Sequence, residues 1–446
     1  MNNFISRVRQ FIDDKDTLTL WLNNLFVLYA FLLPISQSIK AKVFIAIILL
    51  FVLRGDIKKY LKEALSNKVI ISFVYLFIIY ILGLLWTEHE HIKEGLYWIK
   101  SIKYGLYLIV FYAFIDGRYI KKVLTAFIFG MLFSEIISYG MILGIFPWEL
   151  SIGKLHFYAA QTPFDPTPFL HHIHYGVALS FVVILLAQQI YLSKKSILIK
   201  MFMSIFVLTA SANIFATGGR TGYITFILLL STLAIFYLRK WAAAVFLFII
   251  LVVSTAYNQS PIVKSKVEQT IASVEKIFTK EPNFNTSVGI RVGMYYYGWK
   301  AVKNDMILGV GTGDSMAEIY KQSPNDWLGR EQPHEHNQFL STFVKLGLVG
   351  LLVFLNIFYQ IFKYKQEDKE LRFIMIFSTL TIAFGILTTQ FNLRFFMPLW
   401  AVMLAITLIS KERRTITQVI DDKKILLQII VVGFLFSVFN LYSKSS

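Results

Sequence analysis

The chain has 446 residues, of which 56% are hydrophobic and only 16% charged, whereas ordinary soluble domains carry about 25% charged residues. Its formal net charge is +17, yet the basic residues are scattered between apolar runs. A nucleic-acid-binding protein gathers its basic residues on one face, so nucleic acid is not expected as a partner. The chain contains no cysteine, which excludes disulfides, a thiolate nucleophile and cysteine-ligated metal sites.

Apolar runs that approach the length of a membrane-spanning helix recur along the chain. The first, Leu18–Pro34, has no small-residue cleavage site behind it and is expected to be retained as a helix. The alternation of a membrane β-barrel is absent. The sequence therefore predicts an all-α polytopic membrane protein with about 12 or 13 helical spans. We place them at residues 18–35, 41–54, 68–86, 96–115, 123–145, 174–193, 197–217, 221–238, 241–257, 336–362, 372–390, 395–410 and 425–442.

The distribution of Lys and Arg predicts which side of the membrane each connection faces. If the N-terminus is cytoplasmic, every connection assigned to the cytoplasm holds at least two basic residues, and the short connections on the other side are poorer in them. Two long loops, 147–172 and 258–335, then face the periplasm. The second has balanced charge and is expected to fold as a subdomain with helices near 261–278 and 295–304. We predict three parts: a transmembrane bundle at 1–257, a periplasmic subdomain at 258–335 and C-terminal transmembrane helices at 336–446.

Histidines fall only on segments assigned to the outer face: His89, His91, His156, His171, His172, His174, His334 and His336. Histidine avoids lipid and so collects in loops, but it also titrates near neutral pH and can serve acid–base chemistry or bind metal. Three pairs separated by one residue have a spacing seen in zinc sites, yet a catalytic zinc needs three convergent ligands. No metal site is expected. Asp14 and Asp16 form an Asp-x-Asp pair, which we interpret as the start of a helix.

Two arginines stand in glycine-containing segments on the outer side. Arg220 follows Gly218-Gly219 at a turn between two apolar runs, where it either anchors the helix at the interface or offers its guanidinium to phosphate oxygens. Arg291 precedes the glycine run Leu308-Gly-Val-Gly-Thr-Gly313. No buried strand precedes that run, so we interpret it as a tight loop rather than a phosphate-binding one.

The block Pro333-His-Glu-His-Asn-Gln338 is the strongest local feature. His336 stands at the start of a predicted span, at the water–lipid interface, a place that suits a general base for a lipid-linked substrate. An unperturbed histidine has a pKa close to operating pH. His334 and Asn337 are secondary candidates beside it.

These blocks resemble the O-antigen ligase and O-antigen polymerase superfamily of bacterial inner-membrane glycosyltransferases. The likeness rests on the Gly-Gly-Arg-Thr-Gly turn, the segment from Arg291 to Gly313, and His336-Asn337 followed after nine residues by Gly347-x-x-Gly350, and it covers about residues 200–365. It implies transfer of a glycan from undecaprenyl diphosphate, in the periplasm, to a sugar hydroxyl of lipid A–core, with neither metal nor nucleotide as cofactor. His336 would be the base, and Arg220 and Arg291 would hold the diphosphate.

Three other functions stay open at this point. A polymerase uses the same lipid-linked donor but joins one repeat unit to another, and a protein O-oligosaccharyltransferase passes the glycan to protein. A transporter or flippase would need ionisable residues near the bilayer midplane. Few are evident, Lys103, Glu135 and Lys345 being the notable ones.

Overall fold

The structure is a computed structural model that describes residues 14–152, 155–160, 165–192, 194–279, 282–391 and 395–409. Almost all of its regular structure is helical. The α-helices are α2 (Lys15–Leu32), α3 (Gln37–Leu53), α4 (Ile57–Ser66), α5 (Lys68–Leu82), α6 (Ile92–Ile102), α7 (Tyr107–Phe114), α8 (Ile120–Ile142), α9 (His172–Leu192), α10 (Ile197–Ala216), α11 (Arg220–Phe236), α12 (Ala242–Gln259), α13 (Pro261–Ile277), α14 (Ser287–Val302), α15 (Ser315–Gln322), α16 (Gln338–Lys363), α17 (Lys369–Gly385) and α18 (Phe396–Thr407). Short 3-10 helices lie at η1 (His89–His91), η2 (Lys103–Leu106), η3 (Gly117–Tyr119), η4 (Arg239–Trp241) and η5 (Leu328–Glu331).

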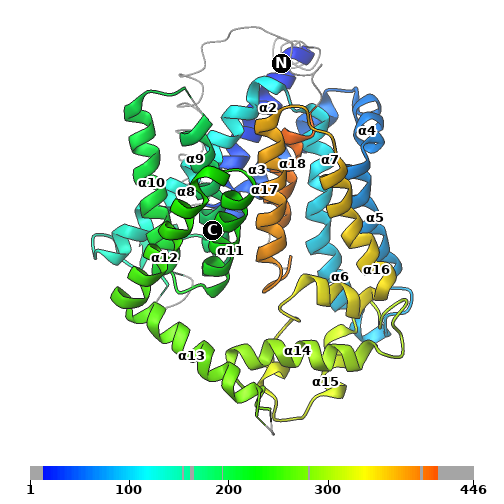
Figure 1. Ribbon diagram of the computed structural model, residues 1–446. Helices are drawn as coiled ribbons and strands as arrows, with labels where there is room; N and C mark the ends of the chain where they lie inside the picture. Colours follow the sequence, from blue (N-terminus) through cyan, green and yellow to red (C-terminus); the bar gives the residue numbers. More distant parts are fainter. Residues whose placement is uncertain are drawn as a thin grey trace.

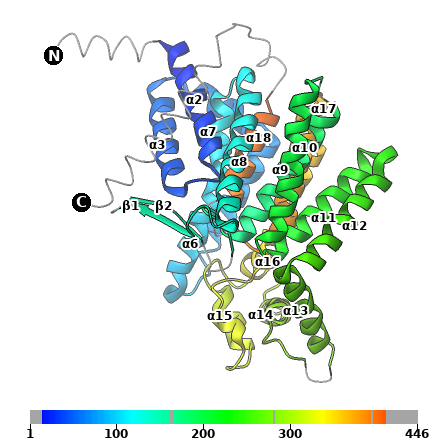
Figure 2. The same cartoon turned by 90° about the vertical axis from the view of Figure 1, so that its left-hand side faces the viewer.

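The helices form one bundle with a cap across one end. In Figure 1 the long helices stand side by side, and α13, α14 and α15 lie beneath them. Figure 2 shows the same arrangement from the side. Helices that follow the loop pack among those that precede it: α16 against α5, α17 against α9 and α11, and α18 against α7. The described helices on the two sides of the loop, α2 to α12 and α16 to α18, therefore pack into a single bundle.

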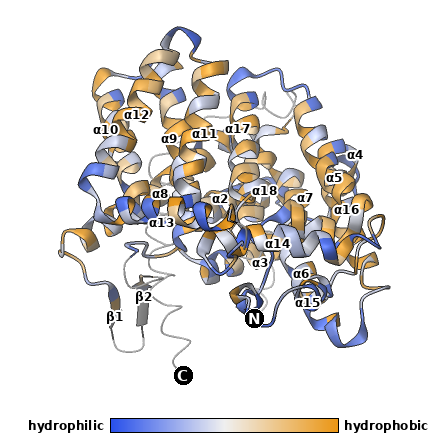
Figure 3. Cartoon of the chain, turned by 60° about the horizontal axis from the view of Figure 1, so that its bottom comes forward, coloured by the Kyte–Doolittle hydropathy of each residue, from blue (hydrophilic) through white to orange (hydrophobic). Residues whose placement is uncertain are grey.

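The polytopic helical fold class is confirmed. Within the described residues, five helical segments are long and apolar enough to cross a membrane: 117–142, 172–192, 197–216, 239–259 and 338–363. A sixth arises if α4 and α5, bent by 92°, are taken together. The other predicted spans up to residue 410 are also helical, but over shorter or less apolar stretches, and 425–442 lies outside the described residues. Hydrophobic residues dominate the bundle helices (Figure 3).

Local sequence signals explain where several helices begin. Asp14 is the N-cap of α2, and its carboxylate accepts hydrogen bonds from the backbone N–H groups of Asp16 and Thr17. This matches the interpretation of the Asp-x-Asp pair as a helix start. Ser260 caps α13 in the same way, with Pro261 at the first helical position.

The segment between α12 and α16 has a small core of its own, made of Met294, Tyr297, Ala301, Ile319 and Trp327. We call residues 258–335 the cap. Its helices α13 and α14 correspond to the two predicted from the sequence, and α14 begins earlier, at Ser287. One departure from the all-α prediction lies in the other long loop, where β1 (Glu149–Ile152) and β2 (Leu155–Ala159) form an antiparallel hairpin.

Candidate active site

Arg220 is the first residue of α11, at the turn after α10. The position of this turn depends on a close contact between α11 and α9, where a Cβ on Gly222 would lie 2.9 Å from the Cα of Gly176. The guanidinium points to the cap: Nη1 donates to Ser287 Oγ over 3.1 Å, and Nη2 donates to Gln269 Oε1 over 3.3 Å. Arg220 therefore joins the end of the bundle to α13 and α14.

Arg291 lies on α14, one turn after Ser287, and its Nη1 donates to the Ser287 carbonyl over 3.0 Å. Both arginines thus meet at the same residue of the cap. The Nε–H of Arg291 is buried and has no hydrogen-bond partner among the described residues. Burial, followed by the charge of Arg220, lowers the pKa of Arg291. Two neighbouring cations with an unpaired donor form a site that an anion would stabilise.

His336 has an unusual backbone, with a φ of 56°, the left-handed region. It is the one non-glycine residue of the described chain with positive φ, a conformation that histidine adopts more readily than most residues and that is common at functional sites. Its ring Nε2 lies 2.9 Å from Gln332 Oε1. Because an amide oxygen only accepts, Nε2 carries the proton and Nδ1 keeps a lone pair for a substrate.

The imidazole of His336 is held neutral. Burial, the neighbouring His334 and the charge of Arg291 together lower the pKa of His336 to about 3, although Glu335 acts in the opposite direction. The unperturbed pKa assumed from the sequence is therefore wrong for His336 in the folded chain. Asn337, the next residue, donates to the hydroxyl of Tyr295, which lies one turn after Arg291 on α14, so the structure brings the segment of His336 to the helix that carries Arg291.

His334 and Asn337 hold this segment in place. The backbone N–H of His336 donates to His334 Nδ1 over 3.3 Å, and the two rings are 4.4 Å apart. Asn337 is the N-cap of α16: its Oδ1 accepts from the Leu340 N–H, while its Nδ2 donates to the Leu387 carbonyl and to the Tyr295 hydroxyl. With its amide occupied, Asn337 is suited to positioning rather than chemistry.

Sequence reasoning missed Glu335, which lies between the two histidines and is fully buried. Its Oε1 accepts from Lys345 Nζ over 2.6 Å, and its Oε2 accepts from Gln390 Nε2. Lys345 also donates to Ser341 Oγ over 2.6 Å and stands over the Trp98 ring. A charged residue inside an apolar run, as Lys345 is in α16, was the available signal, because such a residue needs a buried partner.

The glycine run packs into a break in α16. At Gly347, φ is 62° and ψ is −158°, so the helix is interrupted there. The carbonyls of Val344 and Lys345 accept from the N–H groups of Val310 and Gly311, both over 3.0 Å. A Cβ on Gly309 would lie 2.5 Å from the Gly347 nitrogen. The run is thus a tight loop, as predicted, and it supports the helix that carries His336.

One group with metal-ligand spacing occurs among the described residues. Glu88, His91 and Asp314 place one ligand atom each within 4.8 Å of one another. His91 Nδ1 lies 2.7 Å from Asp314 Oδ1, and the Lys321 ammonium lies 3.6 Å from Glu88 Oε1. The Asp314 and Glu88 carboxylates thus each have a polar partner within the protein. The group is not one of the three predicted histidine pairs, since only His91 of the pair His89/His91 takes part.

An apolar groove of about 370 Å³ runs between α10 and α12 and ends close to Arg220. Leu208, Phe248 and Leu251 line its length, and Ala216 and Ser260 line its end. Ala216 is the last residue of α10, four positions before Arg220. A long hydrocarbon chain in this groove would bring a polar head to the two arginines.

The family comparison falls on this same part of the chain. A family model described as O-antigen ligase matches residues 204–355, about a third of the chain. Residues 204–355 are thus similar to the O-antigen ligase family, which supports the resemblance inferred from the motifs. The ligase-type domain contains Arg220, Arg291 and His336, and the match agrees with the extent inferred from the motifs. The family points to a membrane-embedded, glycosyltransferase-like enzyme that handles lipid-linked glycans. No curated protein matches the chain with significance.

Proposed function

We propose that this protein is an O-antigen ligase-like glycosyltransferase of the bacterial inner membrane, which moves a glycan from undecaprenyl diphosphate to a sugar hydroxyl of lipid A–core in the periplasm. The observation that carries the proposal is the meeting of Arg220 and Arg291 at Ser287, with a buried unpaired donor on Arg291 and the neutral His336 beside them. These groups together would bind an anion and accept a proton from a hydroxyl.

The chemistry follows from these groups. The acceptor hydroxyl attacks the anomeric carbon of the donor glycan, and the bond from that carbon to the diphosphate oxygen breaks. The hydroxyl proton passes to Nδ1 of His336, and the electron pair of the broken bond goes to the diphosphate. Charge-assisted hydrogen bonds from Arg220 and Arg291 stabilise that negative charge. No nucleotide is consumed, because the glycosyl diphosphate bond supplies the driving force.

The charge of the bound donor raises the pKa of His336. A diphosphate beside Arg291 offsets the positive charge that lowers the pKa of His336, so donor binding makes the imidazole a stronger proton acceptor. The apolar groove between α10 and α12 would hold the polyprenyl chain of the donor. His336 would therefore be a stronger base when the leaving group is in place, although burial and His334 still lower its pKa.

The experiment combines purified protein, undecaprenyl-diphosphate glycan and two acceptors, lipid A–core and a second lipid-linked repeat unit, without metal or nucleotide. The proposal expects lipid A–core that carries glycan. Longer lipid-linked chains would identify a polymerase instead, and glycosylated protein from a mixture with protein acceptors would identify a protein oligosaccharyltransferase. Transfer that EDTA abolishes and a divalent ion restores would contradict the metal-independent chemistry and direct attention to Glu88, His91 and Asp314.

A further inference from the structure

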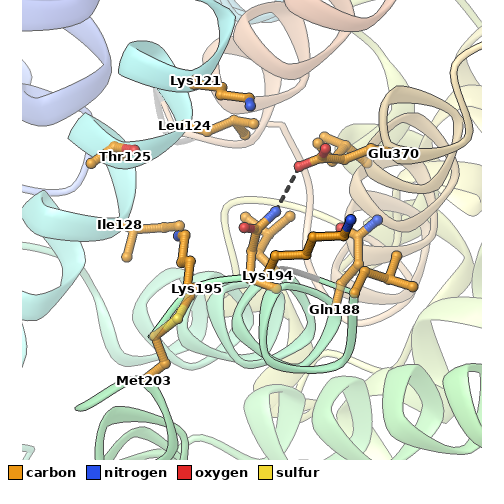
Figure 4. A pocket seen from close by; sticks show the side chains of 13 residues that line it. Lys121, Leu124, Thr125, Ile128, Gln188, Lys194, Lys195, Met203 and Glu370 are labelled. Atoms are coloured by element: carbon orange, nitrogen blue, oxygen red, sulfur yellow. Dashed lines mark hydrogen bonds between the residues drawn. The ribbon is translucent and has the colours of Figure 1, made fainter. Parts of the chain in front are cut away.

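A separate cavity, of about 450 Å³, lies at the other end of the bundle from Arg220 and His336. Its walls come from α8, α9, α10 and α17 and from the connection that follows α9 (Figure 4). Helix α9 begins at His172, whose carbonyl is next to Gly219, and ends at Leu192 in the cavity wall. Its 21 residues span roughly 31 Å, so the cavity and the candidate active site lie at opposite ends of a membrane-length helix.

Positive charge predominates in the lining. Lys121 comes from the start of α8, and Lys194 and Lys195 come from the connection between α9 and α10. Within the described part of the chain, none of these three exposed ammonium groups has an acidic partner at salt-bridge distance. The single carboxylate in the lining, Glu370, accepts a hydrogen bond from Gln189 Nε2 over 2.6 Å. Three cations against one anion favour an anionic ligand.

A buried donor faces the same space. Gln188 lines the cavity and is only 5% exposed, yet its Nε2 has no hydrogen-bond partner among the described residues. A buried donor without an acceptor is unfavourable. An oxygen atom of a bound anion would supply the missing acceptor.

The remaining lining is apolar. Leu124, Ile128, Met203 and Ile374 continue the cavity from the lysines along the helices. Helices α8, α9 and α10 all belong to segments long and apolar enough to span a membrane, so this surface adjoins lipid. A ligand with a phosphate at one end and hydrocarbon at the other matches both parts of the lining.

We propose that this cavity binds an anionic glycerophospholipid of the surrounding bilayer. Its phosphate lies among Lys121, Lys194, Lys195 and the Gln188 amide, and its acyl chains follow the apolar wall. Basic pockets between membrane helices bind acidic head groups in this way. The site is independent of the proposed transfer reaction, since it shares no residue with the arginine and histidine cluster.

Native mass spectrometry of the full-length protein in neutral detergent provides the test, with phosphatidylglycerol and phosphatidylcholine offered in equal amounts. We expect preferential retention of phosphatidylglycerol. Substitution of all three lysines, Lys121→Gln, Lys194→Gln and Lys195→Gln, should weaken its binding at least about tenfold, since each basic residue near an acidic head group contributes about 1 kcal/mol. Glu370→Gln, which removes the repelling carboxylate, should strengthen binding.

Matched variants separate the cavity from general charge effects. Lys58→Gln, Lys59→Gln and Lys62→Gln on α4 remove the same charge outside the cavity and should leave lipid retention unchanged. Replacing the three cavity lysines with arginine keeps the charge and should preserve binding, which shows that the fold tolerates change there. Equal losses in both glutamine triples, or equal retention of the two lipids, would overturn the proposal. Displacement of the lipid by millimolar inorganic phosphate would overturn it as well, since the cavity would then select a small anion.

Discussion

The surroundings of His336 determine its backbone angle, its tautomer and its protonation state. The left-handed φ of 56° turns the chain just before α16, and the Gln332 amide fixes which ring nitrogen carries the proton. Burial, together with His334 and Arg291, lowers the pKa of the ring and keeps it neutral. The tautomer and the protonation state of His336 are thus set by the folded chain, and donor binding then raises its basicity.

The lowered pKa of His336 predicts an unusual pH profile. An ordinary histidine, with a pKa of 6.5, would be protonated below that value and would lose its function as a base. With a pKa of about 3 in the free enzyme, kcat/KM should stay flat as pH falls from 7 to 5. The pKa seen in kcat should be higher, because bound diphosphate offsets Arg291. Transfer rates measured at each pH test this, with thermal unfolding as the control for stability. A kcat/KM that falls with an apparent pKa near 6.5 would show that the pKa of His336 is not lowered.

The buried pair Glu335 and Lys345 predicts a non-additive effect on stability. Lys345→Met leaves the carboxylate buried without its cation and should destabilise the protein by about 3–5 kcal/mol. Combined with Glu335→Gln, the same change removes the uncompensated charge, so the double variant should be more stable than Lys345→Met alone. Unfolding of both variants in the same detergent checks this. A double variant that is less stable than either single one would show that the two residues do not act as a pair.

Among the secondary-structure elements, α16 is held at its break by the glycine run at residues 308–313. Gly347 adopts backbone angles that only glycine takes readily, and Gly309 passes so close that a side chain has no room. Gly347→Ala should therefore lower the melting temperature and reduce transfer, although residue 347 has no polar side chain to contribute. Leu348→Ala, at the exposed neighbouring position, is the matched control and should change little. A Gly347→Ala variant as stable and active as the control would mean that the break in α16 is dispensable.

The sequence predicted most helices and the three candidate residues, because apolar run length and short motifs are local properties. Arg220, Arg291 and His336 were each recognisable from neighbouring glycines, aromatics or histidines. The residues that contact them could not be recognised from the sequence. Ser287 contacts Arg220 across 67 positions of the chain, and Glu335 contacts Gln390 across 55, so no local pattern encodes these contacts. The pKa of His336 was misjudged for the same reason, since burial and Arg291 lower it only in the folded chain.

At the scale of the whole molecule, the two ends of the bundle differ in character: the cap covers one end, and a lysine-lined cavity lies at the other. The charge distribution predicts that the cap faces the periplasm. Because the chain has no cysteine, single cysteines introduced at Tyr60 on α4 and Asn285 in the cap are unique labels. A membrane-impermeant thiol reagent applied to intact spheroplasts should label position 285 and not position 60. The opposite pattern would place the candidate active site in the cytoplasm.

In the proposed mechanism the arginines bind the donor and His336 performs the chemistry, so donor binding and transfer should be measured side by side in the same variants. His336→Asn suits this purpose, because asparagine tolerates the left-handed backbone but cannot act as the base. We expect turnover to fall about 10²–10⁴-fold with the affinity for undecaprenyl-diphosphate glycan nearly unchanged. Arg291→Lys, which keeps the charge but loses the planar fork of donors, should weaken donor binding about tenfold or more. Near-normal transfer by His336→Asn, or unchanged donor binding by Arg291→Lys, would contradict the account.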